Sequence, residues 1–473
     1  FPKGIANRLK IWYNKKDNQI GAERWLRGRT MMMKARNTAA VEGLLEMIRK
    51  SPTAFHAVAA SSEMLEAAGY LCLNEGDRWD LVPGGKYYLT RNQSSILAFS
   101  LPVKDAKQLL LSASHTDSPM FKLKNCYEAP AFGTYGRFDT EVYGGTILSS
   151  WMDRPLSLAG RAVVRDGDGY LARLFSFDRD LMVIPNVAIH MNRTVNSGYA
   201  FNPAVDMLPL FSLLGESPTL SDLLSELLNC SADDIVGLDA FVYNRMPGSV
   251  WGASGEFFSA PRIDNLMCLY GTLCGFLSSA PQPDSLNLWI SADNEETGSA
   301  TKQGAGSVLL SDTLDRICES FGWDKRILLA NGFMVSADNG HAKHPNHPEL
   351  SDPKNAPCLG GGVVIKTNAA QHYTTDAPSA ALFGEICRGA GVPVQQFANR
   401  SDQPGGSTLG SISNTKVPLL TVDIGMAQLA MHSAYETAAG ADCDYLVRAM
   451  TSFYEIGLSS SRDGSWRMRR TEI

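Results

Sequence analysis

The chain has 473 residues, of which 44% are hydrophobic, and this length can bury a large core and form two domains. The net charge of -6 and the pI near 5.8 argue against nucleic-acid binding, which needs a concentrated basic face. No apolar run approaches the ~18 residues of a membrane-spanning helix, so we expect a soluble globular protein with no nucleic-acid or membrane partner.

The nine cysteines are widely scattered, and no two of them have C-x-x-C spacing. Disulfide frameworks normally show an even number of cysteines at regular spacings. The pattern therefore favours reduced thiols and predicts a cytoplasmic location.

The N-terminus is basic, because residues 1–36 hold ten lysines and arginines against only Asp17 and Glu23. An arginine-rich, acid-poor leader is typical of an organelle transit peptide. We favour the alternative, a basic extension upstream of a start near Met31–Met33. The segment lacks the apolar core of a secretory signal.

Helical spacing of apolar residues predicts helices over 38–49 and 51–68, the second with Ser51 and Pro52 as N-cap and first-turn proline. An apolar strand then leads to His115. From 118 to 258 the chain is rich in short β-like runs, including a hairpin whose turn spans Asp166–Gly169. Beyond 259, the pattern predicts helices over 265–277 and 380–390 and strands over 286–291 and 419–422.

These elements predict the α/β class. Residues 37–117 and 259–473 would form an α/β catalytic domain, and residues 118–258 would form a β-rich, barrel-like domain inserted into it.

Side chains that bind metals follow the ends of four apolar β-like stretches. Open α/β sheets bind ligands beyond the carboxyl ends of their strands, so the four strands could aim these groups at one place. A further acid, Asp264, begins a predicted helix. The strand-end residues are His115 and Asp117, Glu295 and Glu296, Asp338, and His432.

Such a set suits two divalent ions, which can share a hydroxide, polarise a scissile carbonyl and stabilise the resulting oxyanion. Imidazole and carboxylate ligands without thiolate favour Zn²⁺ and also admit Mn²⁺ or Co²⁺. Asp264 is the natural bridging ligand, and the Asp117 carboxylate could accept the second imidazole N–H of His115. One of Glu295 and Glu296 would bind metal and the other would act as general base, and the residues alone leave the order open.

Each residue also has an ordinary structural interpretation. Carboxylates after strands are commonly solvated loop residues, and Asp264 could be only a helix N-cap. The histidines of HAKHPNH, His341 among them, lie near two prolines that disfavour a helix, so we expect a loop with one histidine facing substrate. His56, on an apolar helix, is expected to be structural.

Five motifs in this order resemble the aspartyl aminopeptidase family of co-catalytic zinc metallopeptidases: SHTDSP, PRIDNLM, NEETGS, SADNGHAKHPNH and QLAMHS. Four further segments support the likeness: TAFHAV, GGKYYLTRNQSS, IPNVAIHMNR and NRSDQPGGSTLG. The resemblance spans roughly Ala40 to Tyr454.

The resemblance implies removal of an N-terminal Asp or Glu from peptides. It implies that Asp264 bridges the two ions, that Glu295 is the general base, and that Glu296 binds metal. One ion would take His115 and Asp338, and the other would take Glu296 and His432.

The resemblance also implies residues for substrate binding and assembly. Lys366 matches the family lysine that pairs with the acidic side chain of the substrate, and we expect His341 and Tyr373 beside it. His190 matches a histidine that the inserted domain extends into a neighbouring subunit's active site. The family forms dimers through this domain, and the dimers assemble into a dodecamer.

The chain departs from the family pattern near the predicted substrate pocket. DNGH stands where DMAH is common, TNAAQHY where a Lys-Gln-Arg-Tyr segment is usual, and PGG where PCG is usual. Because basic residues are missing near Gln371 and His372, the resemblance does not fix how strongly the enzyme would prefer substrates with an acidic first residue. Rival functions are an N-acyl amino acid deacylase, a neutral-residue aminopeptidase and a noncatalytic scaffold.

Overall fold

The computed structural model describes residues 39–215, 217–403, 405–406 and 408–469, so the basic extension predicted over 1–36 lies outside the described residues. Among these residues, nine strands form the main sheet. In order across the sheet they are β1 (Leu71–Cys72), β2 (Lys86–Arg91), β3 (Ser95–Ser100), β13 (Ser285–Ala292), β4 (Gln108–His115), β14 (Gly332–Ala337), β18 (Leu420–Gly425), β16 (Val363–Lys366) and β17 (Val394–Phe397).

The four strands at the centre of this sheet, β13, β4, β14 and β18, run parallel. Their apolar runs are buried on both faces, as expected for a parallel sheet covered by helices. Because they are parallel neighbours, their carboxyl ends meet at one edge of the sheet. The strands predicted over 286–291 and 419–422 are thereby confirmed as β13 and β18, with small shifts at their ends.

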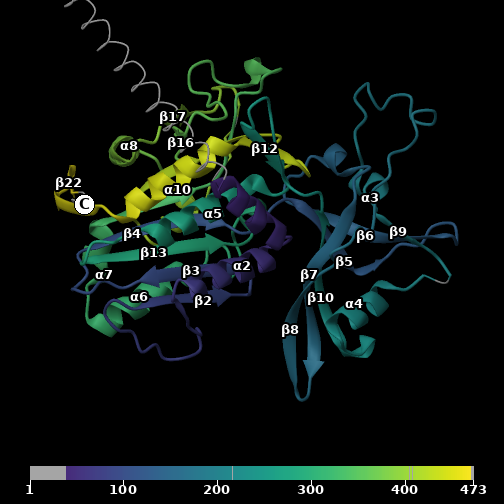
Figure 1. The fold of residues 1–473 in the computed structure, drawn as a ribbon, viewed down its shortest axis with the longest axis horizontal. Helices are drawn as coiled ribbons and strands as arrows, with labels where there is room; N and C mark the ends of the chain where they lie inside the picture. Colours follow the sequence, from purple (N-terminus) through teal and green to yellow (C-terminus); the bar gives the residue numbers. More distant parts are fainter. Residues whose placement is uncertain (1–38, 216, 404, 407, 470–473) are drawn as a thin grey trace, which may run out of the picture.

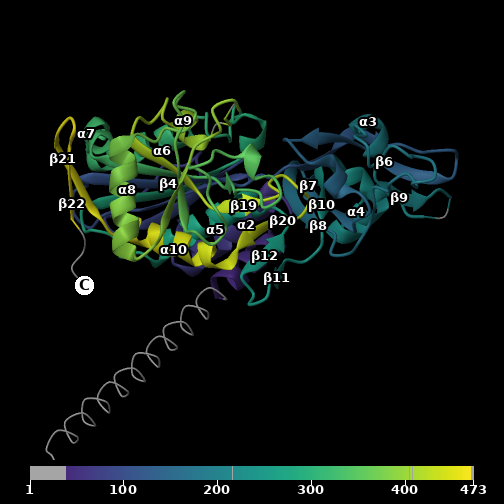
Figure 2. The same ribbon diagram turned by 90° about the horizontal axis from the view of Figure 1, so that it is seen from above.

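Helices cover both faces of the main sheet, which gives a three-layer α/β/α arrangement (Figures 1 and 2). One face packs against a helix over 39–50 and against α2 (Ala54–Ala67), α5 (Ile263–Ser278), α8 (Ala377–Ala390) and α10 (Gly440–Tyr454). The other face carries α6 (Leu309–Phe321), α7 (Lys325–Ala330) and the short α9 (Leu409–Ser413).

Helix α5 packs closely on α10 through two glycines. A methyl group on Gly271 would lie 2.4 Å from the Leu446 side chain, and one on Gly275 would lie 2.4 Å from that of Met450. The two glycines therefore let the helices approach closely.

The cap predicted for α2 is wrong in detail. The helix begins at Ala54, and its N-cap is Thr53, which has extended backbone angles, rather than Ser51. The Thr53 hydroxyl lies 2.8 Å from His56 Nδ1.

A second, β-rich body lies beside the three-layer body in both views (Figures 1 and 2). Its sheet, as far as the described residues show, has six strands in the order β8 (Gly169–Ser176), β7 (Leu156–Asp166), β10 (Ile235–Asn244), β5 (Met120–Glu128), β6 (Tyr135–Tyr143) and β9 (Leu210–Leu213). The helices α3 (Pro203–Asp206) and α4 (Leu220–Leu228) accompany it.

The predicted hairpin is confirmed, since Asp166 pairs with Gly169 at the turn between β7 and β8. The expected barrel is not shown, because the strand order is that of an open sheet with β8 and β9 at its ends. Isolated bridges do join Met182 to Leu156 and Val183 to Leu210.

A smaller sheet connects the two regions next to the ends of the parallel strands. Its strands, within the described part of the chain, are β11 (Ser249–Trp251), β12 (Phe257–Ala260), β20 (Glu436–Ala439), β19 (Ala427–Leu429) and β15 (Gly340–His341). A C-terminal hairpin comprises β21 (Gly457–Arg462) and β22 (Ser465–Arg469). The helices that the structure describes include none long and apolar enough to cross a bilayer.

Candidate metal centre

The strand ends and the start of α5 bring the predicted metal-type residues together. His115 is the last residue of β4, and Asp338 directly follows β14. Glu295 and Glu296 form a 3-10 turn (Glu295–Thr297) just after β13, and His432 follows β19. Asp264 lies at the start of α5 with non-helical backbone angles, and its two carboxylate oxygens face His115 and His432, so the interpretation of Asp264 as only an N-cap is wrong.

Two imidazoles face three carboxylates at nearly equal distances. His115 Nε2 lies 3.6 Å from Asp264 Oδ1 and 3.5 Å from Asp338 Oδ1. His432 Nε2 lies 3.4 Å from Asp264 Oδ2 and 3.5 Å from Glu296 Oε2. Asp264 therefore stands between the two histidines and presents a different oxygen to each.

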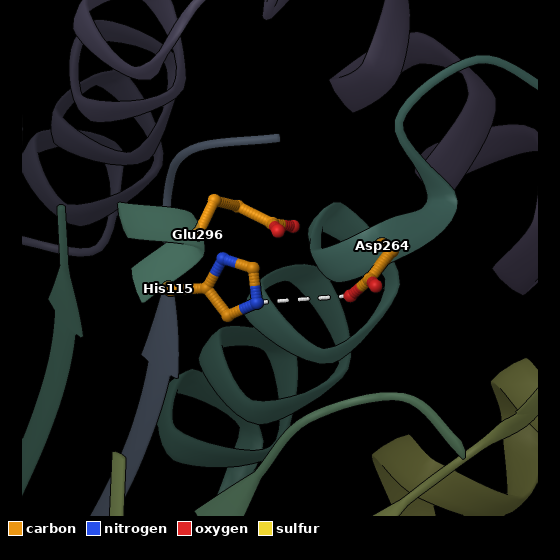
Figure 3. Close-up of side chains that lie close together, drawn as sticks. All are labelled: His115, Asp264 and Glu296. Atoms are coloured by element: carbon orange, nitrogen blue, oxygen red, sulfur yellow. Dashed lines mark ion pairs between the residues drawn. The ribbon is translucent and has the colours of Figure 1, made fainter. Parts of the chain in front are cut away.

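These distances match the spacing between protein atoms that bind one divalent cation better than they match the length of a hydrogen bond. An N–H···O bond normally spans about 2.7–3.2 Å, whereas two ligands of one tetrahedral Zn²⁺, each about 2.1 Å from the ion, lie roughly 3.4 Å apart. Donor atoms of His115, Asp264 and Glu296 all lie within 4.8 Å of one another (Figure 3). Among the described residues, the buried oxygens Asp264 Oδ1 and Glu296 Oε1 have no hydrogen-bond partner.

The electrostatics of the site also favour a bound cation. Burial disfavours charge on His432, but the Asp264 and Glu296 carboxylates outweigh it and raise the pKa of His432 to about 10. Burial likewise opposes protonation of His115, yet Asp117, Asp264 and Asp338 raise its pKa well above the usual value. Burial and the Asp264 charge raise the pKa of Glu296. His115, His432 and Glu296 thus favour their protonated forms, whereas the two histidines outweigh burial and lower the pKa of Asp264.

Asp117 holds the turn that carries the two glutamates. Its Oδ1 accepts from the Glu295 backbone N–H at 3.2 Å, and its Oδ2 accepts from the Glu296 N–H at 3.2 Å and the Tyr143 hydroxyl at 2.7 Å. The Asp117 backbone carbonyl lies 3.1 Å from His115 Nδ1, while the Asp117 carboxylate is 3.4 Å away. The carbonyl is therefore the nearer acceptor for this imidazole, and the carboxylate predicted for this role lies slightly farther away.

Glu295 has the environment of a proton acceptor. It is partly exposed at the edge of the site, and its pKa is raised to about 8, chiefly by burial and further by the charge of Asp338. A bound cation would lower this value. Glu295 can therefore exchange a proton near neutral pH.

The predicted substrate-binding residues form a connected group beside the metal-type residues. Lys366, at the end of β16, is buried, with Nζ 2.7 Å from the Asn339 carbonyl and 3.7 Å from Asp338 Oδ2. Its Nζ also lies 5.4 Å from the centre of the Tyr373 ring. The Tyr373 ring contacts Phe397, which in turn contacts His341. His341 and Phe397 line a cavity of about 260 Å³.

Other predicted residues lie elsewhere. His190 is exposed between β8 and α3, and within the described chain no hydrogen bond or ion pair joins it to the metal-type residues. His56 contacts Thr53, in agreement with a structural role. All nine cysteines lie in the described part of the chain, and none forms a disulfide.

Sequence reasoning missed Glu436, which supports two of the metal-type residues. Its carboxylate accepts from the backbone N–H of His432 at 2.7 Å and from that of Asp264 at 3.0 Å. Burial raises the pKa of Glu436 to about 8. The only signal in the sequence is an acid four residues after His432, at the end of HSAYE.

One buried and one partly exposed imidazole, His115 and His432, face three carboxylates at the carboxyl edge of the parallel sheet. With a further glutamate poised beside them, they define a metal-dependent hydrolase site. Residues 47–454 match the family model described as aminopeptidase I zinc metalloprotease (M18). A probable M18 family aminopeptidase 2 of Clostridium acetobutylicum is 41% identical over 87% of this chain and 98% of its own length.

Solved structures agree in fold. The cryo-EM structure of the Ape4 and Nbr1 complex matches with a TM-score of 0.85 and 34% identity, covering 89% of this chain and 86% of that one. The S. cerevisiae mApe1 dodecamer matches with a TM-score of 0.78 and 25% identity, covering 88% and 96% of the two chains. This chain belongs to the M18 family of zinc metalloproteases and is a metallo-aminopeptidase.

Proposed function

We propose that this aminopeptidase removes N-terminal Asp or Glu from peptides with the aid of two divalent ions, most simply Zn²⁺, with Mn²⁺ and Co²⁺ as alternatives. The observation that carries the acidic specificity is the buried Lys366 ammonium, 3.7 Å from Asp338 Oδ2. A fixed positive charge next to the cation site can pair with the carboxylate of the substrate's first side chain.

The geometry supports a division of the ligands between two ions. His115 and Asp338 would hold one ion, His432 and Glu296 would hold the other, and Asp264 would bridge them through its two oxygens. The buried oxygens of Asp264 and Glu296 that lack hydrogen-bond partners are the atoms such ions would satisfy.

When bound, the ions supply a Lewis acid for the scissile carbonyl and lower the pKa of a water molecule. The Glu295 carboxylate would accept a proton from the attacking water and pass it to the nitrogen of the leaving amine. Asp117 keeps the Glu295 backbone in place through the hydrogen bond to its N–H. Lys366 orients the substrate by its acidic side chain.

The departures from the family pattern do not remove the positive charge of Lys366. Gln371 and His372, where basic residues are usual, are both exposed, whereas Lys366 and Tyr373 are buried. We therefore propose that Lys366 provides the main acidic recognition.

We also propose that residues 118–258 form a dimerisation domain, and that His190 completes the active site of a neighbouring subunit in a dodecamer. The mApe1 match, itself solved as a dodecamer, supports assembly. The exposed apolar side chains flanking His190 support an interface there; they are Val187, Ile189 and Met191.

The test is hydrolysis of Asp-, Glu- and Leu-anilides and of their acyl-capped forms by purified protein, before and after chelation and with Zn²⁺, Mn²⁺ or Co²⁺ restored. Metal-dependent cleavage that favours Asp or Glu is the expected result. Preference for Leu or for acyl-capped substrates would refute the acidic specificity. Absence of turnover with every metal would favour a noncatalytic scaffold.

A further inference from the structure

A buried asparagine, Asn339, joins the predicted substrate pocket to the metal-type residues. It directly follows Asp338 and is 3% exposed. Its Nδ2 donates to the Ile263 carbonyl at 2.9 Å and to Gln428 Oε1 at 2.8 Å, and its Oδ1 accepts from the Cys268 thiol at 3.1 Å. The side-chain amide is thus satisfied by three partners from two elements, Ile263 and Cys268 of α5 and Gln428 of β19.

The chemistry of these partners fixes the direction of each hydrogen bond. The Ile263 carbonyl can only accept, so the side-chain nitrogen of Asn339 must face it. The second N–H of this nitrogen then reaches Gln428 Oε1, which leaves the Gln428 nitrogen to donate to Glu436 Oε1 at 3.3 Å. Side chains other than the asparagine amide would leave some of these groups unpaired.

One end of this network supports the metal-type residues. Ile263 immediately precedes Asp264, and Glu436 accepts from the backbone N–H groups of Asp264 and His432. Gln428 and Glu436 are each 1% exposed, so water does not compete for these bonds. A shift of Asn339 would therefore be transmitted to two residues that face the cation site.

The other end supports Lys366. The Asn339 backbone carbonyl accepts from Lys366 Nζ at 2.7 Å, which is shorter than the 3.7 Å between Nζ and Asp338 Oδ2. The closest fixed partner of the buried ammonium is therefore Asn339. The position of the ammonium depends on residue 339 staying in place.

We propose that Asn339 is a positioning residue that holds Lys366 and the Asp264 and His432 ligands in one frame, so that it controls both acidic selectivity and metal retention. The inference rests on the proposed function and deepens it. It concerns the DNGH segment, where this chain departs from the DMAH pattern.

The test compares Asn339→Asp and Asn339→Ala with the wild type. A carboxylate at 339 would face the Ile263 carbonyl and Gln428 Oε1, both of which are acceptors, whereas alanine only removes the bonds. Asn287→Asp is the matched control, because Asn287 is equally buried in β13 and bonds to Ser285 and the Tyr454 carbonyl, away from the site. Each protein is assayed for thermal unfolding, for kcat/KM on Glu- and Leu-anilides, and for the chelator concentration that removes half of its metal.

We expect Asn339→Asp to lower the Glu-to-Leu selectivity and the half-removal chelator concentration about tenfold each, an effect of about 1.4 kcal/mol. Asn339→Ala should lower both about threefold, and Asn287→Asp should change neither by more than twofold. If Asn339→Asp does not fold, Asn339→Ala decides by the same two readouts. Unchanged selectivity and metal retention in a folded Asn339 variant, or equal changes in the control, would overturn the proposal. A wild-type protein without acidic preference would refute the proposed function instead, and the chelator readout would then judge Asn339 alone.

Discussion

Replacing Asp117 by Asn tests whether the turn of the two glutamates is held by a charged acceptor. The substitution keeps the shape but leaves one oxygen where there were two. The remaining oxygen can keep the two donors at Oδ2, the Tyr143 hydroxyl and the Glu296 N–H, so the new NH₂ group must face the Glu295 N–H.

The loss of one hydrogen bond to a charged acceptor costs about 1.5–3 kcal/mol. At 1.4 kcal/mol for each factor of ten, kcat should fall roughly 10- to 150-fold. KM should change little, because Glu295 acts on the water and the leaving amine while Lys366 binds the substrate. The assay is steady-state hydrolysis of a Glu-anilide, with metal content measured on the same sample.

Asp442→Asn is the matched control. Asp442 is also buried and accepts from two backbone N–H groups, those of Gly360 at 2.8 Å and Gly362 at 2.9 Å, but it belongs to α10 and holds a different turn. This variant should lose stability and keep its kcat. A kcat for Asp117→Asn within twofold of the wild type, or an equal loss in Asp442→Asn, would refute the reasoning.

Three further predictions address the remaining roles. Glu295→Gln should lower kcat by about 10²–10⁴-fold because the proton acceptor is lost. Its metal content, measured by atomic emission, should stay near the wild-type value. Substantial residual turnover would show that Glu295 is not the proton acceptor. Lys366→Met should lower kcat/KM for Asp- and Glu-anilides about 10- to 100-fold, as expected for a charged hydrogen bond of 1.5–3 kcal/mol, and should spare Leu-anilide; equal losses on all three substrates would contradict acidic recognition. Burial and then the charge of Arg262 lower the pKa of His56 to about 4. At this site the folded protein therefore binds fewer protons than the unfolded chain. As the pH falls from about 6.5 to 4, His56 should lower the free energy of unfolding by on the order of 2–3 kcal/mol. His56→Asn should therefore lose less thermal stability than the wild type over this pH range, and parallel curves would disprove the assignment.

The sequence predicted the sheet best where the apolar runs were continuous. The runs that became β4, β13, β14 and β18 are largely apolar, with Asp423 in β18 as the one acid, and they are buried on both faces, so their strand character is local information. Their adjacency was expected because ligands bind beyond the carboxyl ends of strands in open α/β sheets, and the parallel pairing gathers His115, Asp338 and the two glutamates at one edge.

The supporting residues could not be predicted in the same way. Glu436, Gln428 and Asn339 act on backbone groups or on side chains distant in sequence, and no local pattern marks such contacts. Part of the role of Asp117 was missed for the same reason. Its carboxylate serves the N–H groups of Glu295 and Glu296, whereas the spacing alone suggested the neighbouring imidazole. The division of the metal ligands and the reach of His190 into a neighbouring subunit stay predictions.

The most direct test of the two-metal account is a titration of metal-free protein with Zn²⁺ while hydrolysis of Asp-anilide is followed. Because Asp264 faces both imidazoles, the account predicts that activity reaches its maximum when two ions are bound per chain. Full activity at one ion per chain, or activity that does not depend on added metal, would contradict it.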